Sequence, residues 1–269
     1  MGIVRPKISC PINRQGQPAG RPHVVSSQAQ SPTPHNPNCG RLGPGTLDSN
    51  DELFDVCDDR GRPLGYTRPR ALVHRDGDWH RSFHCWVVHG GSPSNPLVLL
   101  QRRSPTKDTW AGLWDVSVAG HYSAGEGIEG GLREIREELG LDVPAADLVH
   151  VGWRREQVYH ENGVIEREVQ DIVFLHREVD LLALRPEPQE VTGVASIPFR
   201  QLLRLTDGQL GSFTAPGVRV ASNGCVTAAS FALYPPDLVS RSGGYYGKAA
   251  RLAARLRAGR GRVIRRRWW

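Results

Sequence analysis

The sequence predicts an α+β sandwich in which the strands of a mixed sheet surround one short helix. Apolar segments of strand length recur along residues 53–198, and turn-forming residues separate them. A helical repeat of apolar residues lies among these segments at residues 128–139, after a long glycine-containing loop. Strands on both sides of a single loop and helix are typical of the α+β class.

Four predicted strands precede this helix. The first alternates polar and apolar residues before a glycine-containing turn, and the fourth leads into the helix. In order, the segments are LFDVCDDRGRPLG, FHCWVV, LVLLQRR and WDVSVAG. The residues HGGSPSNP, which favour loops, separate the second strand from the third.

Three more strands and two helices are predicted after the acidic helix. The turn ENG joins the strands LVHVGWRREQVYH and VIEREVQDIVFLHREV, and VTGVASIP is the next strand. The segments FRQLLRL and YYGKAARLAARLRA have a helical repeat.

Composition divides the 269 residues into a folded body and two basic ends. Residues 1–47 are rich in Pro, Gly, Ser, Asn and Gln, and we predict that they form a disordered extension. Residues 48–258 are predicted to fold as one domain, and residues 259–269 form a basic C-terminal tail. The chain carries a net charge of +6, whereas residues 48–247 carry −8. The acidic body argues against a nucleic-acid surface there. The tail suits weak contact with nucleic acid or anionic lipid, or serves only to keep the protein in solution.

The sequence contains no apolar run long enough to span a membrane, and its N-terminus lacks the apolar core of a secretory signal. These absences predict a soluble, cytoplasmic protein, with organelle targeting by residues 1–47 as the alternative. The five cysteines are scattered and lack C-x-x-C spacing. Neither a disulfide framework nor a zinc site is therefore indicated.

The most informative segment is residues 120–141, GHYSAGEGIEGGLREIREELGL. On a repeat of 3.6 residues, one side of the predicted helix is apolar and the other is acidic. The apolar side consists of Ile128, Leu132, Ile135 and Leu139, and the acidic side consists of Glu134, Glu137 and Glu138. Carboxylates at these spacings repel one another, so the helix predicts a site for Mg2+ or Mn2+. Arg133 is placed to brace the cluster, and Gly140 is placed to end the helix.

This segment closely resembles the Nudix box, which is written G-x5-E-x7-R-E-U-x-E-E-x-G-U with U aliphatic. The matching residues are Gly120, Glu126, Arg133, Glu134, Ile135, Glu137, Glu138, Gly140 and Leu141. Six residues instead of seven separate Glu126 from Arg133, so the loop before the helix is one residue short. The resemblance implies an α/β/α sandwich with a mixed central sheet, formed by residues 48–258 as a Nudix hydrolase domain.

The resemblance also implies an activity, which is divalent-metal-dependent hydrolysis of a diphosphate bond. In such enzymes the box glutamates hold Mg2+ and water attacks the diphosphate. The implied metal site consists of Glu134, Glu137 and Glu138 with the backbone carbonyl of Gly120. Glu134 is the first choice for the general base. Glu168, which shares a strand face with Glu166, is the alternative base or a further ligand.

Segments outside the box are similar to the Nudix subgroup related to isopentenyl diphosphate isomerase. They include LFDVCDDRGRPLGYTRPRALVHRDGDWHRSFHCWVV and LLQRRSPTKDTWAGLWDVSVAGH. Arg103 and Lys107 match the pair that clamps the diphosphate in the isomerase, with an exposed surface pair as the plain alternative. The metal ligands of the isomerase are loosely matched by His74, His80, His121, Glu166 and Glu168, although the spacing from His74 to His80 is one residue short. For the three histidines, hydrogen-bonded polar residues are the plain alternative.

One departure separates this chain from the isomerase. Ala119 stands at the position of the isomerase cysteine, and an alanine side chain can neither donate nor accept a proton. The box REIREELGL is intact, whereas the isomerase tends to have a degraded box. The predicted substrate is therefore a small organic, isoprenoid or nucleoside diphosphate derivative, which the enzyme hydrolyses. Isomerase-type activity and a non-catalytic Nudix module that binds a ligand are the alternatives.

Overall fold

The computed structural model of the protein describes residues 51–257. The predicted N-terminal extension (1–47) and the basic tail (259–269) lie outside the described residues. The strands are β1 (Leu53–Cys57), β2 (Pro63–Pro69), β3 (His80–Ser92), β4 (Asn95–Arg103), β5 (Trp114–Asp115), β6 (Val118–His121), β7 (Leu148–Tyr159), β8 (Ile165–His176), β9 (Val191–Pro198), β10 (Phe213–Val220) and β11 (Val226–Leu233). The α-helices are α1 (Arg70–Asp76), α2 (Gly131–Leu139), α3 (Phe199–Thr206) and α4 (Tyr245–Arg257).

Strand β3 organises the sheet. It pairs in parallel with β8 along residues 80–88, and antiparallel with β6 at residues 82–85 and with β4 at residues 88–92. The sheet continues from β4 through β9 and β10 to β11, while β7 pairs with β8. One parallel pair among antiparallel pairs confirms the predicted mixed sheet.

The single strand predicted from WDVSVAG is wrong, because this segment divides between two partners. Strand β5 pairs with β4, whereas β6 pairs with β3, so the chain crosses from one strand to the other. Ser117 lies at the crossing. Its hydroxyl accepts a hydrogen bond from the Val87 amide at 2.9 Å and donates one to the Leu99 carbonyl at 2.6 Å. The side chain thus satisfies backbone groups where β4 and β6 part.

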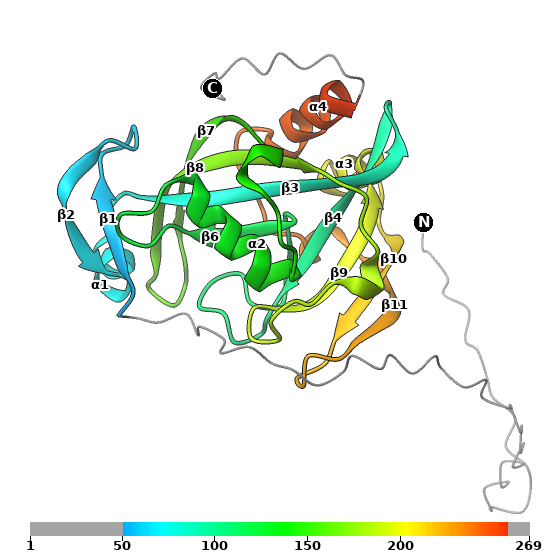
Figure 1. Cartoon of the computed structure of the whole chain (residues 1–269), viewed down its shortest axis with the longest axis horizontal. Coiled ribbons are helices and arrows are strands. Elements are labelled where there is room, and N and C mark those ends of the chain that lie inside the picture. Colours follow the sequence, from blue (N-terminus) through cyan, green and yellow to red (C-terminus); the bar gives the residue numbers. More distant parts are fainter. Residues whose placement is uncertain (1–50, 258–269) are drawn as a thin grey trace, which may run out of the picture. The chain divides into compact units, whose positions relative to one another are not determined.

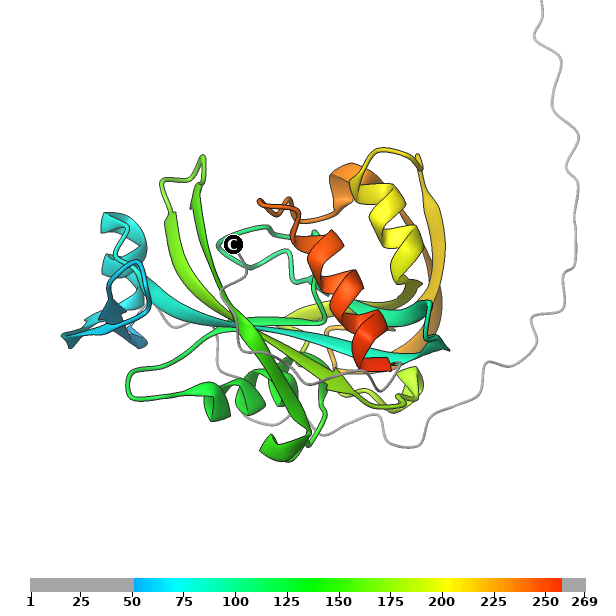
Figure 2. The same ribbon diagram turned by 90° about the horizontal axis from the view of Figure 1, so that it is seen from above.

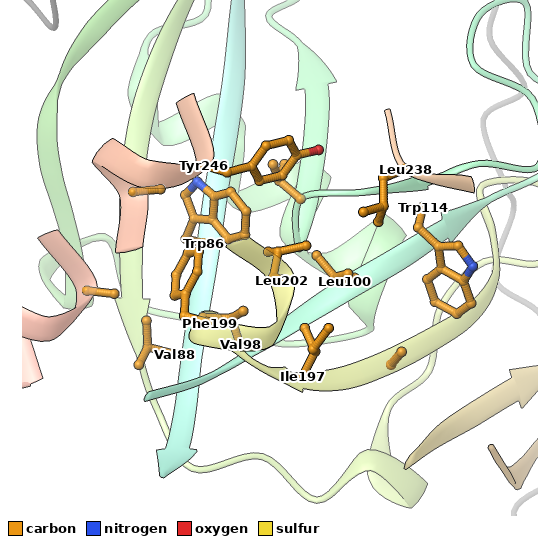
Figure 3. Close-up of a cluster of buried hydrophobic side chains, with 14 of the residues drawn as sticks. Trp86, Val88, Val98, Leu100, Trp114, Ile197, Phe199, Leu202, Leu238 and Tyr246 are labelled. Atoms are coloured by element: carbon orange, nitrogen blue, oxygen red, sulfur yellow. The ribbon is translucent and has the colours of Figure 1, made fainter. Parts of the chain in front are cut away.

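Helices cover both faces of the sheet, as expected for an α/β/α sandwich (Figures 1 and 2). Alternate residues of β3 point to opposite faces and divide the core in two. Phe83, Cys85 and Val87 pack with α2, whose Ile135 and Leu139 are fully buried. On the other face, α3 and α4 pack on a second cluster, which contains Trp86, Val88, Leu100, Phe199, Leu202 and Tyr246 (Figure 3).

Most predicted elements are present, with differences at their ends. The box helix begins with a 3-10 turn, Ile128–Gly130, and ends at Gly140, whose φ of 68° lies in the left-handed region. The sequence did not predict β2, α1, β10 and β11. Strand β2 is mostly exposed, α1 has only seven residues, and β10 contains Pro216 and Gly217, which weaken a strand signal. Within residues 51–257, each helix is too short or too polar to cross a membrane.

Gly131→Ala should destabilise the protein, although alanine is the better helix former. A Cβ atom at residue 131 would overlap the ring of Phe83, which is fully buried. We expect the free energy of unfolding to fall by about 1–3 kcal/mol from overpacking, more than the gain of roughly 1 kcal/mol from helix propensity. Urea denaturation measures the change. Gly211→Ala, which meets open space, is the matched control. An unchanged or higher stability of Gly131→Ala would contradict the packing described here.

Candidate active site

A cavity of about 440 Å³ opens beside α2 and the parted strands β4 and β6. The residues around it come from the whole of the described chain, from Glu52 to Arg241. Each of the seven side chains or backbone groups predicted for the site lines this cavity. They are Arg103, Lys107, Gly120, Glu134, Glu137, Glu138 and Glu168.

Two carboxylates of α2 are buried although they carry like charge. Only 7% of Glu134 and 1% of Glu138 is exposed. Glu138 Oε2 accepts hydrogen bonds from Gln101 Nε2 at 2.7 Å and from the Ala119 amide at 2.8 Å. Glu134 packs against Gly120, where a Cβ atom would overlap its carboxyl group. Both side chains thereby join the helix to β6, and a side chain at residue 120 would displace the Glu134 carboxyl group.

Arg133 braces the acidic side of α2, as its position in the helix predicts. Its guanidinium group contacts three carboxylates, of Glu126 at 3.2 Å and of Glu134 and Glu137 at 3.1 Å. It also donates to the His121 carbonyl at 3.1 Å. Arg133 and Glu126 form this ion pair although the loop between them is one residue shorter than in the box pattern.

Burial changes the acidity of the α2 carboxylates. It raises the pKa of Glu134 to about 8, although the Arg133 guanidinium opposes the shift and the Glu137 carboxylate adds to it. Burial and the charge of Glu134 raise the pKa of Glu138 well above its usual range. Such pKa values favour the protonated acids near neutral pH unless further positive charge enters the cavity.

Glu190 is a fourth acidic residue of this cluster that the sequence reasoning missed. It is 7% exposed, lines the cavity and forms an ion pair with Lys107. The loop before β9 reaches the site because its backbone bonds to α2: the amides of Arg185 and Glu187 donate to the carbonyls of Leu139 and Glu137 at 3.1 and 2.8 Å. The sequence contains only an acidic residue before a strand there, so no local pattern could have identified this contact.

Arg103 and Lys107 lie on the cavity wall, at the end of β4 and in the loop that follows. Arg103 Nε donates to the Thr109 carbonyl at 3.2 Å, which fixes the side chain. Trp110 lines the cavity from the same loop, with a backbone φ of 53°. Trp114 instead packs in the core against Phe231, as expected for the default role of a tryptophan.

The three predicted histidines come together beside the acidic cluster. Nitrogen atoms of His74, His80 and His121 all lie within 4.8 Å of one another. The Nε2 atoms of His74 and His80 are buried and have no hydrogen-bond partner among the described residues. Burial lowers the pKa of these two groups, to about 2 for His74 and about 4 for His80. Both rings are therefore neutral, the form that binds a metal ion.

His121 differs from the other two because both of its nitrogens are engaged. Arg70 donates to Nδ1 at 3.0 Å, since a guanidinium is a donor only. Nε2 therefore carries the hydrogen and donates to Glu168 Oε1 at 3.2 Å. A neutral ring that bound a cation through Nε2 would carry its hydrogen on Nδ1 instead. Arg70 would then have to turn away from His121.

Glu168 is held by several donors on the face of β8 that it shares with Glu166. Its Oε2 accepts from Ser82 Oγ at 2.8 Å and from Gln170 Nε2 at 2.7 Å. Burial raises the pKa of Glu168, but the hydrogen bond from His121 outweighs it and keeps the pKa well below its usual range. Glu168 is thus a fixed carboxylate, in contrast to Glu134.

One part of the cavity, which we call the floor, is lined by His84, Asp115 and Arg241. The sequence did not predict this part. The guanidinium of Arg241 donates to Asp115 Oδ2 at 2.6 Å and to Glu156 Oε2 at 2.9 Å. Burial opposes ionisation of Asp115, but Arg241 lowers its pKa below the usual value. These residues come from four separate segments, so only the folded chain brings them together.

Comparison with known proteins gives a family for this arrangement. The family model for the NUDIX domain matches residues 78–214, about half of the chain. An uncharacterized Nudix hydrolase of Clostridium acetobutylicum is 35% identical over 196 residues, which cover 73% of this chain and 94% of that protein.

Two further relatives resemble shorter parts of the chain. Nudix hydrolase 3 of Arabidopsis thaliana is 36% identical over 156 residues, which cover 56% of this chain and 20% of that protein. An isopentenyl-diphosphate Delta-isomerase of Paenarthrobacter aurescens is 36% identical over 148 residues, which cover 54% of this chain and 76% of that protein. With the box residues Gly120, Arg133, Glu134, Glu137 and Glu138 lining one cavity, these matches show that the chain belongs to the Nudix hydrolase family, which acts on diphosphate-containing substrates.

Proposed function

We propose that this protein hydrolyses the diphosphate bond of a small molecule with the help of Mg2+ or Mn2+ held by α2. The observation that carries the proposal is the burial of Glu134 and Glu138 beside Arg103 and Lys107 in one cavity. Acidic groups that hold a cation and basic groups that hold phosphate are both needed in such a reaction, because the substrate is highly charged.

The residues present fit a divalent cation. Glu134, Glu137 and Glu138 supply carboxylate oxygens, which Mg2+ and Mn2+ prefer, and the raised pKa values indicate that positive charge would stabilise them. Glu134 lies close to the backbone of Gly120, and we propose the Gly120 carbonyl as a further ligand. A cation held there would offset the charge of the diphosphate and lower the pKa of water.

Glu134 is the better candidate for the general base. A base works best when its pKa lies near the operating pH. Burial raises the pKa of Glu134 to about 8, and a cation held beside it would lower the pKa from that value, so that the carboxylate is ionised yet able to take a proton. The pKa of Glu168 is instead held low, and its oxygens already accept three hydrogen bonds. In the proposed reaction water attacks one phosphorus, Glu134 takes its proton, and the bond from that phosphorus to the bridging oxygen breaks. Arg133 orients α2 and its carboxylates.

Arg103 and Lys107 are proposed to bind the two phosphoryl groups. The guanidinium is planar and can pair with two phosphate oxygens, whereas the ammonium acts as a mobile point charge. Lys107 is now paired with Glu190. We expect a phosphate oxygen to compete with Glu190 for this lysine. The Glu190 carboxylate would then be available as an additional oxygen ligand for a cation beside the α2 cluster.

The histidine cluster is proposed to hold a second cation. The unbonded, buried Nε2 atoms of His74 and His80 support this site, and the Asp78 carbonyl, 3.0 Å from His80 Nδ1, orients that ring. Glu168 would supply a carboxylate oxygen. The contact of Arg70 with His121 opposes binding, so this site should be weaker than the one on α2.

Two other functions fit the observations less well. Relatives named isopentenyl-diphosphate Delta-isomerase share the fold, but Ala119, which lines the cavity, offers no proton to a carbon–carbon double bond. A non-catalytic module that only binds a ligand would not require buried carboxylates with raised pKa values. The three box glutamates that line the cavity, Glu134, Glu137 and Glu138, therefore favour hydrolysis.

Glu138→Gln should reduce Mg2+-supported hydrolysis by at least about 100-fold, because the loss of a ligand charge removes several kcal/mol of transition-state stabilisation. The amide retains one oxygen that can accept from Gln101 and Ala119, so the fold should persist. Phosphate release over a panel of diphosphates at saturating Mg2+ and Mn2+ measures the effect. The control is Glu129→Gln, an exposed glutamate on the preceding turn. Retention of most of the rate at saturating Mg2+ would refute the assignment of Glu138.

Glu134→Gln should become more stable relative to the wild type as the pH rises from about 5 to 8 in the presence of a chelator. Because the pKa of Glu134 is raised on folding, the folded chain keeps a proton in this window that the unfolded chain has lost. Wild-type stability therefore falls with rising pH, and the neutral variant escapes this loss, which we expect to be about 1–3 kcal/mol. Urea denaturation of both proteins across the window tests it. A difference that does not vary with pH would show that Glu134 titrates normally.

Isopentenyl and dimethylallyl diphosphates should not interconvert in the presence of this protein, because Ala119 replaces the thiol that moves the proton. Incubation with either isomer and Mg2+ or Mn2+, followed by chromatography of the products, decides the question. Substantial formation of the other isomer would require a proton donor that the proposed mechanism lacks.

A further inference from the structure

The floor of the cavity is charged and polar. Among the described residues that line the whole cavity, Trp110 and Ala119 are the only hydrophobic ones. The floor itself offers the imidazole of His84, the carboxylate of Asp115 and the guanidinium of Arg241. Asp115 and Arg241 already bond to each other, but an apolar chain would leave the remaining polar atoms of the floor without a partner, which is unfavourable.

His84 presents a hydrogen-bond donor to this floor. Its Nδ1 lies 3.1 Å from the hydroxyl of Tyr245, which is 3.0 Å from the indole Nε1 of Trp86. Since an indole N–H is a donor only, the hydroxyl accepts from Trp86, and we assign its own hydrogen to His84 Nδ1. The hydrogen of the neutral ring is then on Nε2, the nitrogen remaining for the cavity.

The surroundings keep His84 neutral. The residue is 2% exposed, and burial, with a smaller effect of the Arg241 charge, lowers its pKa to about 3. His84 therefore donates one hydrogen and carries no charge at any physiological pH. Because the charge of Arg241 is already paired with Asp115 and Glu156, the floor suits an uncharged acceptor atom rather than a third phosphoryl group.

The floor is close to the place where the diphosphate is proposed to react. His84 lies directly opposite Ala119 in the pairing of β3 with β6, and the Ala119 amide bonds to Glu138. Asp115 lies opposite Gln101 in the pairing of β4 with β5, and Gln101 bonds to the same carboxylate. A substrate whose phosphoryl groups approach Glu138 thus has its organic group near His84 and Asp115.

We propose that the floor recognises a polar organic group of the substrate, such as a sugar or a nucleobase, and that His84 Nε2–H donates to an acceptor atom of that group. Asp115 accepts from a donor of the same group, while Arg241 holds Asp115 in place. Tyr245 acts as a positioning residue because it fixes the hydrogen on Nε2. The inference rests on the proposed hydrolysis and selects among its substrates, with isoprenyl diphosphates disfavoured.

The test compares kcat/KM for two substrate classes, nucleoside diphosphate sugars and isoprenyl diphosphates, in the full-length protein with Mg2+ or Mn2+. The wild type should prefer the polar class by at least about tenfold, the value of one well-placed hydrogen bond. His84→Leu should lower this preference about tenfold, mainly through KM. His84→Gln, which keeps an N–H donor, should retain part of it. His176→Leu, at an exposed position on β8, is the control.

Tyr245→Phe separates positioning from folding. It should reduce the same preference, but it should cause no further reduction when His84 is already leucine, because its effect passes through His84. Equal loss on both substrate classes in either variant, or additive effects in the double variant, would refute the proposed role of the pair. A wild-type preference for isoprenyl diphosphates would overturn the inference while leaving hydrolysis intact.

The affinity of the floor for the organic group can be measured even if the protein hydrolyses no diphosphate. Calorimetric titration with methylene-bridged, non-hydrolysable analogues of both classes measures affinity without turnover. If the wild type binds the polar analogue more tightly and His84→Leu does not, recognition by the floor is supported even when no hydrolysis is observed. Equal or tighter binding of the isoprenyl analogue would refute it.

Discussion

The burial of two like-charged groups on one short helix is the constraint on which this architecture depends. The apolar side of α2 fixes the helix to the sheet, which also carries Glu134 and Glu138 out of water. Their charges are unfavourable there unless donors and cations surround them. The parting of β4 and β6 serves this need, because the two strands deliver Gln101 and the Ala119 amide to one carboxylate. Gly120, which has no side chain, leaves space for the carboxylate of Glu134.

The features predictable from the sequence are those whose signal is local. The faces of α2 follow from spacing along one helix, and the ion pair of Arg133 with Glu137 follows from the same repeat. Strands β3, β4 and β8 contain runs of apolar residues that predict strands without any knowledge of their partners. Contacts made by Glu190, Asp115 and Arg241 have no such signal, because they depend on loops that return from distant parts of the chain. The division of the strand at Ser117 was also unpredictable, since each half is too short to show its partner.

The cavity combines carboxylates that differ widely in acidity. Burial dominates at Glu134, whereas hydrogen-bond donors dominate at Glu168. Two chemically identical groups in one cavity thereby favour different protonation states at the same pH, which is the usual basis for dividing roles between an acid or base and a fixed charge. The difference arises from neighbours on β3, β6 and β8, so the sheet determines which residue can move a proton.

The hydroxyl of Tyr245 connects the cavity to the core between the sheet and α4. Tyr245 belongs to the hydrophobic cluster that α3 and α4 form with Trp86, and it does not line the cavity. Under the role proposed for His84, substitutions that repack the C-terminal helix would alter ligand choice without changing any wall residue. Paralogues with identical cavity walls could then diverge in substrate, and a comparison restricted to lining residues would overlook the cause.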